Sequence, residues 1–232
     1  MTVLVLLPGL GGTSELFEPF VAALGSAVAT KIIRYPGDGA LGYDALAALV
    51  RAALPVGEPY VLLGESFSGP IAISLAAEGG AQLRGLVLCC SFARNPRPSL
   101  GPLRVLLPLA PIVPRPLGLL SRLLMGRLVT DTLRRSLAQA LRQLAARALK
   151  ARLRAVLSID VSAELSRVAV PVLYLHATED RVVPDAALRH IRRIRPEARV
   201  VSIPAPHFLL QTRPGEAARA VLGFIRGVVQ SD

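Results

Sequence analysis

A serine between small residues is the side chain of this 232-residue chain best suited to nucleophilic chemistry. Ser66 lies in Gly64-Glu65-Ser66-Phe67-Ser68-Gly69, which follows the apolar run 60–63 and precedes a helical pattern at 70–77. A nucleophile on a sharp strand-to-helix turn needs small residues two positions before and after it, because the backbones pass closely there. Gly64 and Ser68 meet this requirement. The motif therefore predicts Ser66 as a nucleophile, and the alternative is an ordinary tight turn.

A serine hydroxyl needs a base to remove its proton, and the chain has three histidines that could do this. His176 falls within a strand pattern and His190 within a basic helical pattern, so we expect structural roles for both. His207 follows the last apolar run, in the loop that leaves the carboxyl edge of the predicted sheet. Active sites of α/β proteins gather at this edge. We therefore predict His207 as the general base.

The base needs a carboxylate that orients it and stabilises the imidazolium form. Glu179 and Asp180 both follow the apolar run 172–176, at the same predicted edge. Asp180 is the preferred candidate because the run 180–184 places it on a turn before a helix that begins near Pro184, and Glu179 is the reserve. The chain order Ser, Asp, His is the order expected of this strand-turn-helix motif.

Six short runs rich in Val, Ile and Leu predict the strands that position these residues. They span 3–7, 28–34, 60–63, 86–90, 172–176 and 198–203. Runs of this kind are typical of fully buried strands in a parallel sheet. Helical patterns lie between them: one begins near Glu18, and Asp44 is expected to cap another. The alternation predicts an α/β fold, with a mostly parallel six-stranded sheet and helices on both faces.

One segment, 94–160, interrupts this alternation. Its first part, 94–118, holds seven prolines and no strand pattern. A single helix is then expected, with one apolar face. That face comprises Leu133, Leu137, Leu141, Leu144 and Ala148. We interpret 94–160 as an inserted helical lid, here called the lid segment, and 1–93 with 161–232 as the core.

The lid segment carries the whole net charge of the chain. It holds 13 basic and two acidic residues, and the formal net charge of the chain is +11. Such a charge concerns partners more than fold. Arg134, Arg135 and Arg142 are predicted to bind an acidic partner, since arginine suits phosphate and carboxylate groups. The alternative is that the leucines seal the lid segment to the core and the arginines keep it soluble.

Several classes of site and location are disfavoured by the sequence. The adjacent Cys89 and Cys90 make neither a disulfide framework nor a metal cluster, so we expect no metal and a reducing, cytoplasmic setting. No cofactor is expected, because the glycine-rich turn at 9–12 lacks both the phosphate-loop and the dinucleotide fingerprint. No leader peptide or membrane-spanning helix is expected. The lid segment has no aromatic residue, which argues against single-stranded nucleic acid and favours an aliphatic ligand.

Together these motifs resemble the α/β-hydrolase superfamily over nearly the whole chain. The resemblance rests on the turn at 8–12, the Ser66 motif, the lid segment and the loops of Asp180 and His207. It implies an oxyanion hole made by the backbone N–H groups of Leu10 and Phe67, and acyl transfer to water through a serine ester. The turn reads Pro8-Gly9 where many relatives have His-Gly, and Ser68 replaces a glycine.

The layout of the lid segment resembles that of esterases that cleave the methyl ester of pimeloyl-acyl carrier protein, in which basic lid residues meet the acidic carrier. We therefore expect a serine-dependent carboxylic ester hydrolase that acts on an aliphatic acyl ester, such as one linked to acyl carrier protein. The alternatives are an acyl thioesterase, a lipase or esterase on an anionic membrane surface, and a non-catalytic ligand-binding protein of the same fold.

Overall fold

The computed structural model describes residues 2–105 and 117–229 and contains a six-stranded sheet in which all strands are parallel. The strands are β1 (Val3–Leu7), β2 (Ala29–Ile32), β3 (Tyr60–Glu65), β4 (Leu83–Cys89), β5 (Val172–Ala177) and β6 (Arg199–Ile203). Their order across the sheet is β2-β1-β3-β4-β5-β6. After β1 the chain first adds β2 on one side and then β3 on the other. The switch point between β1 and β3 is where ligands bind in such sheets.

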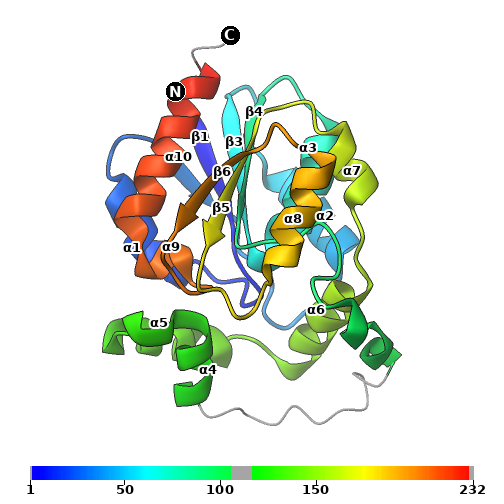
Figure 1. The fold of residues 1–232 in the computed structure, drawn as a ribbon, viewed down its shortest axis with the longest axis vertical. Helices are drawn as coiled ribbons and strands as arrows, with labels where there is room; N and C mark the ends of the chain where they lie inside the picture. The colour runs from blue at the N-terminus through cyan, green and yellow to red at the C-terminus, as the bar shows by residue number, and fades with distance from the viewer. Residues whose placement is uncertain (1, 106–116, 230–232) are drawn as a thin grey trace.

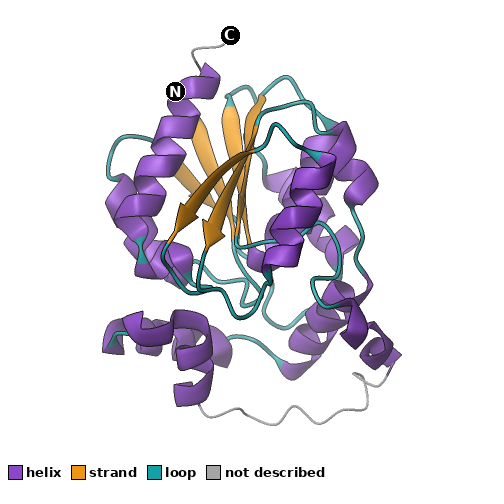
Figure 2. Cartoon of the chain, in the orientation of Figure 1, coloured by secondary structure: helices purple, strands orange, loops and turns teal. Residues whose placement is uncertain are grey.

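Helices cover both faces of the sheet, as Figures 1 and 2 show. One face packs against α2 (Tyr43–Ala53), α3 (Gly69–Glu78), α7 (Ser162–Arg167) and α8 (Asp185–Ile194). The other packs against α1 (Glu18–Leu24), α9 (Leu209–Thr212) and α10 (Pro214–Val229). Successive side chains of β1 alternate between the two layers, Val5 in the first and Leu4 in the second. The predicted α/β fold with helices on both faces is confirmed.

Two local expectations were wrong. The runs at β2 and β6 are not fully buried, because these are the edge strands, and Lys31 and Arg199 lie exposed on them. Asp44 does not cap α2: the helix begins at Tyr43 after Gly42, with no side-chain cap. Asp44 instead lies in the first turn, where a negative charge still interacts favourably with the helix dipole.

The lid segment connects β4 to α7 and begins and ends at one place on the core. Its ends pair through an antiparallel bridge between Arg94 and Asp160, and the Asn95 N–H donates to the Ile159 carbonyl at 2.9 Å. Between them lie η3 (Pro98–Val105), α4 (Leu117–Met125), η4 (Gly126–Leu128), α5 (Asp131–Arg142) and α6 (Ala146–Ser158). In Figure 1 these helices lie below the carboxyl ends of the strands. Four of the seven prolines of 94–118 lie outside the described residues.

The expected single helix is two helices, α5 and α6, separated at 143–145. Ala145 is extended, and its N–H donates to the Gly37 carbonyl at 2.8 Å. The carbonyl of Gln143 packs so closely on Gly37 that a Cβ there would overlap it. A contact with the loop after β2 therefore breaks the helix, which no glycine or proline at 143–145 signals. None of the described helices is long and apolar enough to cross a membrane.

Candidate active site

Ser66 lies on a strained turn between β3 and α3. Its φ of +49° is in the left-handed region, which costs a non-glycine residue about 1–3 kcal/mol. The turn continues as the short 3₁₀ helix η2 (Ser66–Ser68). A Cβ at Gly64 would lie 2.7 Å from the Ser68 carbonyl oxygen and 2.9 Å from the Cβ of Ala72. The glycine is therefore required by this close approach, as the sequence motif predicts.

Two residues that sequence reasoning missed hold this turn in place. The Ser91 hydroxyl donates to the Ser66 carbonyl at 2.5 Å. Ser91 is in turn bonded at both backbone groups by Tyr174: the tyrosine hydroxyl donates to the Ser91 carbonyl at 2.7 Å and accepts from its N–H at 3.2 Å. A Cβ at Gly69 would overlap the Ser91 hydroxyl, so the glycine makes room for this contact. No local signal marks Ser91, since it acts from the end of the neighbouring strand.

Ser66, His207 and Asp180 form one hydrogen-bonded relay. The Ser66 Oγ lies 2.9 Å from the His207 Nε2, and the His207 Nδ1 lies 2.7 Å from the Asp180 Oδ2. The second Asp180 oxygen, Oδ1, accepts the backbone N–H groups of Val182 at 2.7 Å and Val183 at 3.0 Å. The side chains of His207 and Asp180 are only 5% and 4% exposed. The Asp180 carboxylate thus holds the imidazole with its Nε2 turned toward the Ser66 hydroxyl.

The other candidates lie elsewhere. Glu179 is exposed beside Asp180, and its N–H donates to the Ala205 carbonyl at 3.0 Å. The His176 Nε2 on β5 lies 3.0 Å from the Asp185 carboxylate at the start of α8. His190 bonds Ser162 at 2.8 Å, and its partial burial lowers its pKa. The structure brings together the three residues that the spacing favoured and leaves the reserve acid and the other two histidines away from them.

The loop after β1 is tied to the Ser66 turn by the residue that replaces a glycine. The Ser68 hydroxyl donates to the Pro8 carbonyl and shares a 2.6 Å hydrogen bond with the buried Tyr35 hydroxyl. Within the loop, the Gly12 N–H donates to the Gly9 carbonyl at 3.0 Å, closing a turn that Gly12 permits with a φ of +73°. The hydroxyl at position 68 therefore fixes the loop that carries the Leu10 N–H.

Glu65, directly before Ser66, is a buried carboxyl group that sequence reasoning also missed. It accepts a hydrogen bond from the Gln211 amide at 2.8 Å and is bonded by the backbone of Gly9. Burial raises the pKa of this carboxyl group, although the two hydrogen bonds and nearby His207 oppose the shift. An acidic residue ending an otherwise apolar strand was the available signal. Through its bond to Gly9, Glu65 holds the start of the loop after β1 against the core.

An apolar cavity of about 370 Å³ lies over Ser66 and His207. This volume is near the lower end for small-molecule sites. The core contributes Leu10, Leu16, Phe67, Phe92, Val182, Val183 and Phe208. The lid segment contributes Pro96, Leu120, Leu123, Leu124, Leu137, Ala140, Leu141, Leu144, Leu149, Leu153 and Val156. Glu65 is the only Asp, Glu, Lys or Arg among the described lining residues, so the cavity suits an uncharged aliphatic group.

The backbone positions expected to form the oxyanion hole, Leu10 and Phe67, both line this cavity beside Ser66. The Phe67 ring is anchored in the core, stacked on Tyr43 with centroids 4.8 Å apart. In contrast, the three arginines proposed for partner binding lie exposed on α5 and do not line the cavity. Those residues are Arg134, Arg135 and Arg142.

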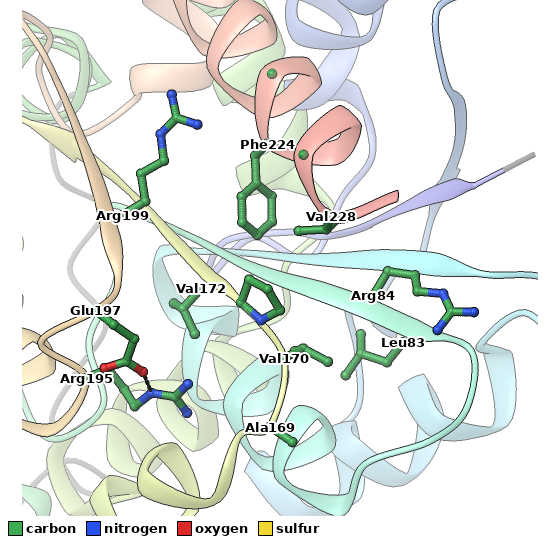
Figure 3. A pocket seen from close by; sticks show the side chains of 13 residues that line it. Leu83, Arg84, Ala169, Val170, Val172, Arg195, Glu197, Arg199, Phe224 and Val228 are labelled. Atoms are coloured by element: carbon green, nitrogen blue, oxygen red, sulfur yellow. Dashed lines mark hydrogen bonds and ion pairs between the residues drawn. The ribbon is translucent and has the colours of Figure 1, made fainter. Parts of the chain in front are cut away.

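A second cavity, of about 730 Å³, lies at the opposite edge of the sheet, where β4 and β5 begin (Figure 3). Its arginines do not converge: Arg84 and Arg199 point in different directions, and Arg195 pairs with Glu197. No serine, cysteine or histidine is among its described lining residues. The smaller cavity is therefore the candidate active site. Within residues 2–105 and 117–229 no cluster of three metal-ligating side chains occurs.

A parallel sheet whose strand ends join a strained serine, a histidine and an aspartate has the architecture of the α/β-hydrolase class. The family model described as alpha/beta hydrolase family matches residues 4–220, and the chain belongs to this family.

Among curated proteins, the chain is 26% identical over 254 residues to the biotin biosynthesis bifunctional protein BioHC of Cellvibrio japonicus. The match covers 96% of this chain and 47% of that protein, so the chain spans about half the length of its curated relative. Among solved structures, it resembles a hydrolase from Oleispira antarctica (TM-score 0.80, 17% identity, 97% and 91% of the two chains covered). It also resembles a bromoperoxidase from Bacillus anthracis (TM-score 0.79, 17% identity, 97% and 92% covered). These structural likenesses establish the fold.

Proposed function

We propose that the protein is a serine-dependent carboxylic ester hydrolase that acts on an aliphatic acyl ester. The observation that carries this proposal is the relay from Asp180 through His207 to the strained Ser66, which opens into an apolar cavity. A nucleophile, a base and an orienting acid in this geometry are suited to acyl transfer.

The reaction follows from the geometry in two halves. The Ser66 Oγ attacks the acyl carbon while the His207 Nε2 takes its proton, and the oxyanion that forms accepts hydrogen bonds from the N–H groups of Leu10 and Phe67. Each such donor stabilises the transition state by about 3–4 kcal/mol. His207 then protonates the departing alcohol, which leaves an ester on Ser66. Water attacks this ester as His207 takes its proton, releasing the acid and restoring the serine. Asp180 orients the imidazole in both halves.

The composition of the cavity favours a substrate that buries an uncharged aliphatic acyl group there. Leucines of the lid segment form much of its wall, and its small volume favours a short or medium chain. Flexible leucine side chains adapt to an alkyl chain, whereas a carboxylate buried here would have no cation to pair with among the described lining residues.

The exposed arginines of α5 favour a substrate whose acyl group is attached to an acidic carrier. Arg135 and Arg142 are exposed there, and Arg134 shares its charge with Asp131 at 3.6 Å. Both the resemblance of the lid segment to esterases of pimeloyl-acyl carrier protein and the match to a biotin biosynthesis protein favour acyl carrier protein. Because these arginines would also attract an anionic membrane, a lipase or esterase acting at a membrane surface is the second candidate. A thioester would react by the same steps.

Turnover of p-nitrophenyl esters with acetyl to decanoyl chains tests the ester hydrolase directly. We expect the wild type to prefer short or medium acyl chains. Ser66→Ala should lower kcat on the order of 10⁶-fold, because the serine, histidine and aspartate act together as one catalytic unit. Ser166→Ala, on the exposed surface of α7, is the matched control and should leave kcat unchanged. Equal rates for the wild type and Ser66→Ala would overturn the proposal in favour of a ligand-binding protein of this fold.

A further inference from the structure

Arg152 is the buried member of the otherwise exposed set of described arginines in the lid segment. It lies on α6 with no solvent exposure. Its Nη1 donates to the Leu10 carbonyl at 2.7 Å and its Nη2 to the Pro36 carbonyl at 2.9 Å. The guanidinium also lies over the ring of Tyr35, 5.6 Å from the centroid. None of the described carboxylates forms an ion pair with it, and its Nε is buried without a partner.

Burying a cation whose hydrogen bonds go only to carbonyl groups costs more desolvation free energy than an apolar contact between the same two parts of a protein. Desolvation of the charge lowers the pKa of Arg152, because burial disfavours the protonated form. Replacing buried charges by apolar residues of similar size is often neutral or stabilising. The leucines of the lid segment already pack on the core without such a charge. The position of Arg152 therefore points to a role besides attachment.

The loop after β1 shows what that role is. Three successive carbonyls of this loop, those of Pro8, Gly9 and Leu10, each accept a hydrogen bond. The first two donors, Ser68 and Gly12, belong to the core. The third carbonyl, that of Leu10, is held by Arg152 from the lid segment.

These bonds fix the two peptide planes that flank Leu10. In a trans peptide the C=O and N–H directions are opposed, and the described residues contain no cis peptide bond. The Gly9 carbonyl, turned toward Gly12, thus sets the plane that contains the Leu10 N–H. The Leu10 carbonyl, held by Arg152, sets the next plane and so fixes Leu10 from its other side. A Cβ at Gly12 would lie 2.8 Å from the Arg152 Nη1, so the loop is shaped around the guanidinium. Without Arg152 the second plane loses this bond, and Leu10 is held from one side only.

We propose that Arg152 is a positioning residue that couples docking of the lid segment to the conformation of the loop whose Leu10 N–H serves as an oxyanion donor. This inference rests on the proposed ester hydrolase. It gives the lid segment a part in the chemical step, beyond shaping the cavity and facing a partner. A purely structural Arg152 would affect the stability of the fold without changing the rate of the folded enzyme.

The test is the kinetics of Arg152→Ala, with Arg154→Ala on the exposed side of the same helix as the matched control. With p-nitrophenyl hexanoate we expect kcat of Arg152→Ala to fall about tenfold to a hundredfold. This decrease does not exceed the decrease in kcat expected when a whole oxyanion donor is removed. KM should change less than about threefold, because the acyl cavity is untouched. Millimolar methylguanidinium should restore part of kcat, and methylammonium, which lacks the planar fork, should restore less.

Thermal unfolding of each variant separates the rate effect from folding. If Arg152→Ala does not fold, Arg152→Lys takes its place in the test. A single ammonium group cannot bond the carbonyls of both Leu10 and Pro36, so we expect folded Arg152→Lys to have a lower kcat than the wild type. An unchanged kcat in either folded variant, or a loss that only matches the unfolded fraction, would overturn the inference. Ser66→Ala distinguishes failure of this inference from failure of the proposed function. If Ser66→Ala abolishes turnover while the Arg152 variants keep full kcat, the ester hydrolase is supported and the role of Arg152 in positioning the loop is overturned.

Discussion

The core and the lid segment use charged side chains in different ways. In the core, acidic and basic residues are equal in number, and the acids near Ser66 are buried and individually bonded: Asp180 by His207 and two backbone amides, Glu65 by Gln211 and Gly9. The lid segment carries the net charge of +11 and exposes its described arginines, with Arg152 as the exception.

This difference separates two tasks. Buried, fully bonded groups at the ends of β3, β5 and β6 keep fixed geometry, as the proposed chemistry requires. Exposed arginines on α5 keep their side-chain freedom and act through a screened field, which suits the capture of a partner. Substitutions of these buried groups should therefore change kcat with every substrate, and substitutions of exposed lid arginines should change only the use of acidic partners.

Among the substitutions that distinguish the core from the lid segment, Asp180→Asn in the core should have the largest effect. An amide cannot hold His207 in the tautomer that leaves Nε2 as acceptor, so we expect kcat to fall on the order of 10⁴-fold with every ester, including the smallest. The measurement is kcat for acetyl and hexanoyl p-nitrophenyl esters. Glu179→Gln, the exposed neighbour, is the control and should retain activity. The assignment of the acid would be wrong if the two variants behaved alike.

A smaller effect, confined to charged partners, is expected from Arg134→Gln, Arg135→Gln and Arg142→Gln combined. We expect KM for an acyl ester linked to acyl carrier protein to rise about tenfold at low salt and kcat with p-nitrophenyl esters to stay unchanged. The KM difference should shrink at high salt, since screening weakens interactions between exposed charges. Arg135 and Arg142 should contribute more than Arg134, which is partly neutralised by Asp131.

The control for this variant is a second triple change to glutamine, at exposed arginines of the core: Arg192, Arg219 and Arg226. An equal rise of KM in both triple variants would show that net charge, and not the face of α5, attracts the carrier. Binding to anionic vesicles that depends on the α5 arginines, with no such dependence for the carrier-linked ester, would favour the membrane-surface esterase instead.

The smallest effect is expected from Glu65→Gln, measured as the free energy of unfolding against pH. Burial raises the pKa of Glu65 in the folded protein above its unfolded value, so the folded state holds the proton to higher pH. As pH rises above about 4.5, ionisation favours the unfolded chain, and the wild type should lose stability relative to Glu65→Gln until the folded pKa is passed. We expect a difference on the order of 1 kcal/mol. A wild type that instead gains stability over this range would show that the bonds from Gly9 and Gln211 outweigh burial.

The sequence was sufficient to predict what depends on local pattern and on the common edge of a parallel sheet. Ser66 was predicted from the small residues around it, and Asp180 and His207 from their places just after apolar runs. The structure brings these three together because the carboxyl ends of β3, β5 and β6 meet at one edge.

Other features depend on contacts between distant segments, and no local pattern reveals them. The break between α5 and α6 is caused by Gly37, more than a hundred residues earlier in the chain. In the sequence, Arg152 is one of 13 basic residues of the lid segment, and Ser91 belongs to no motif. Their roles arise only when the lid segment meets the loop after β1 and when β4 lies beside β3.

The most direct measurement of the central proposal is the site and rate of covalent labelling by a fluorophosphonate, followed by mass spectrometry of peptides. We predict a single adduct on the peptide that contains Ser66, formed about 10³-fold more slowly in His207→Ala, because the base no longer takes the serine proton. An adduct at another residue, or equal labelling rates with and without the imidazole, would contradict the account.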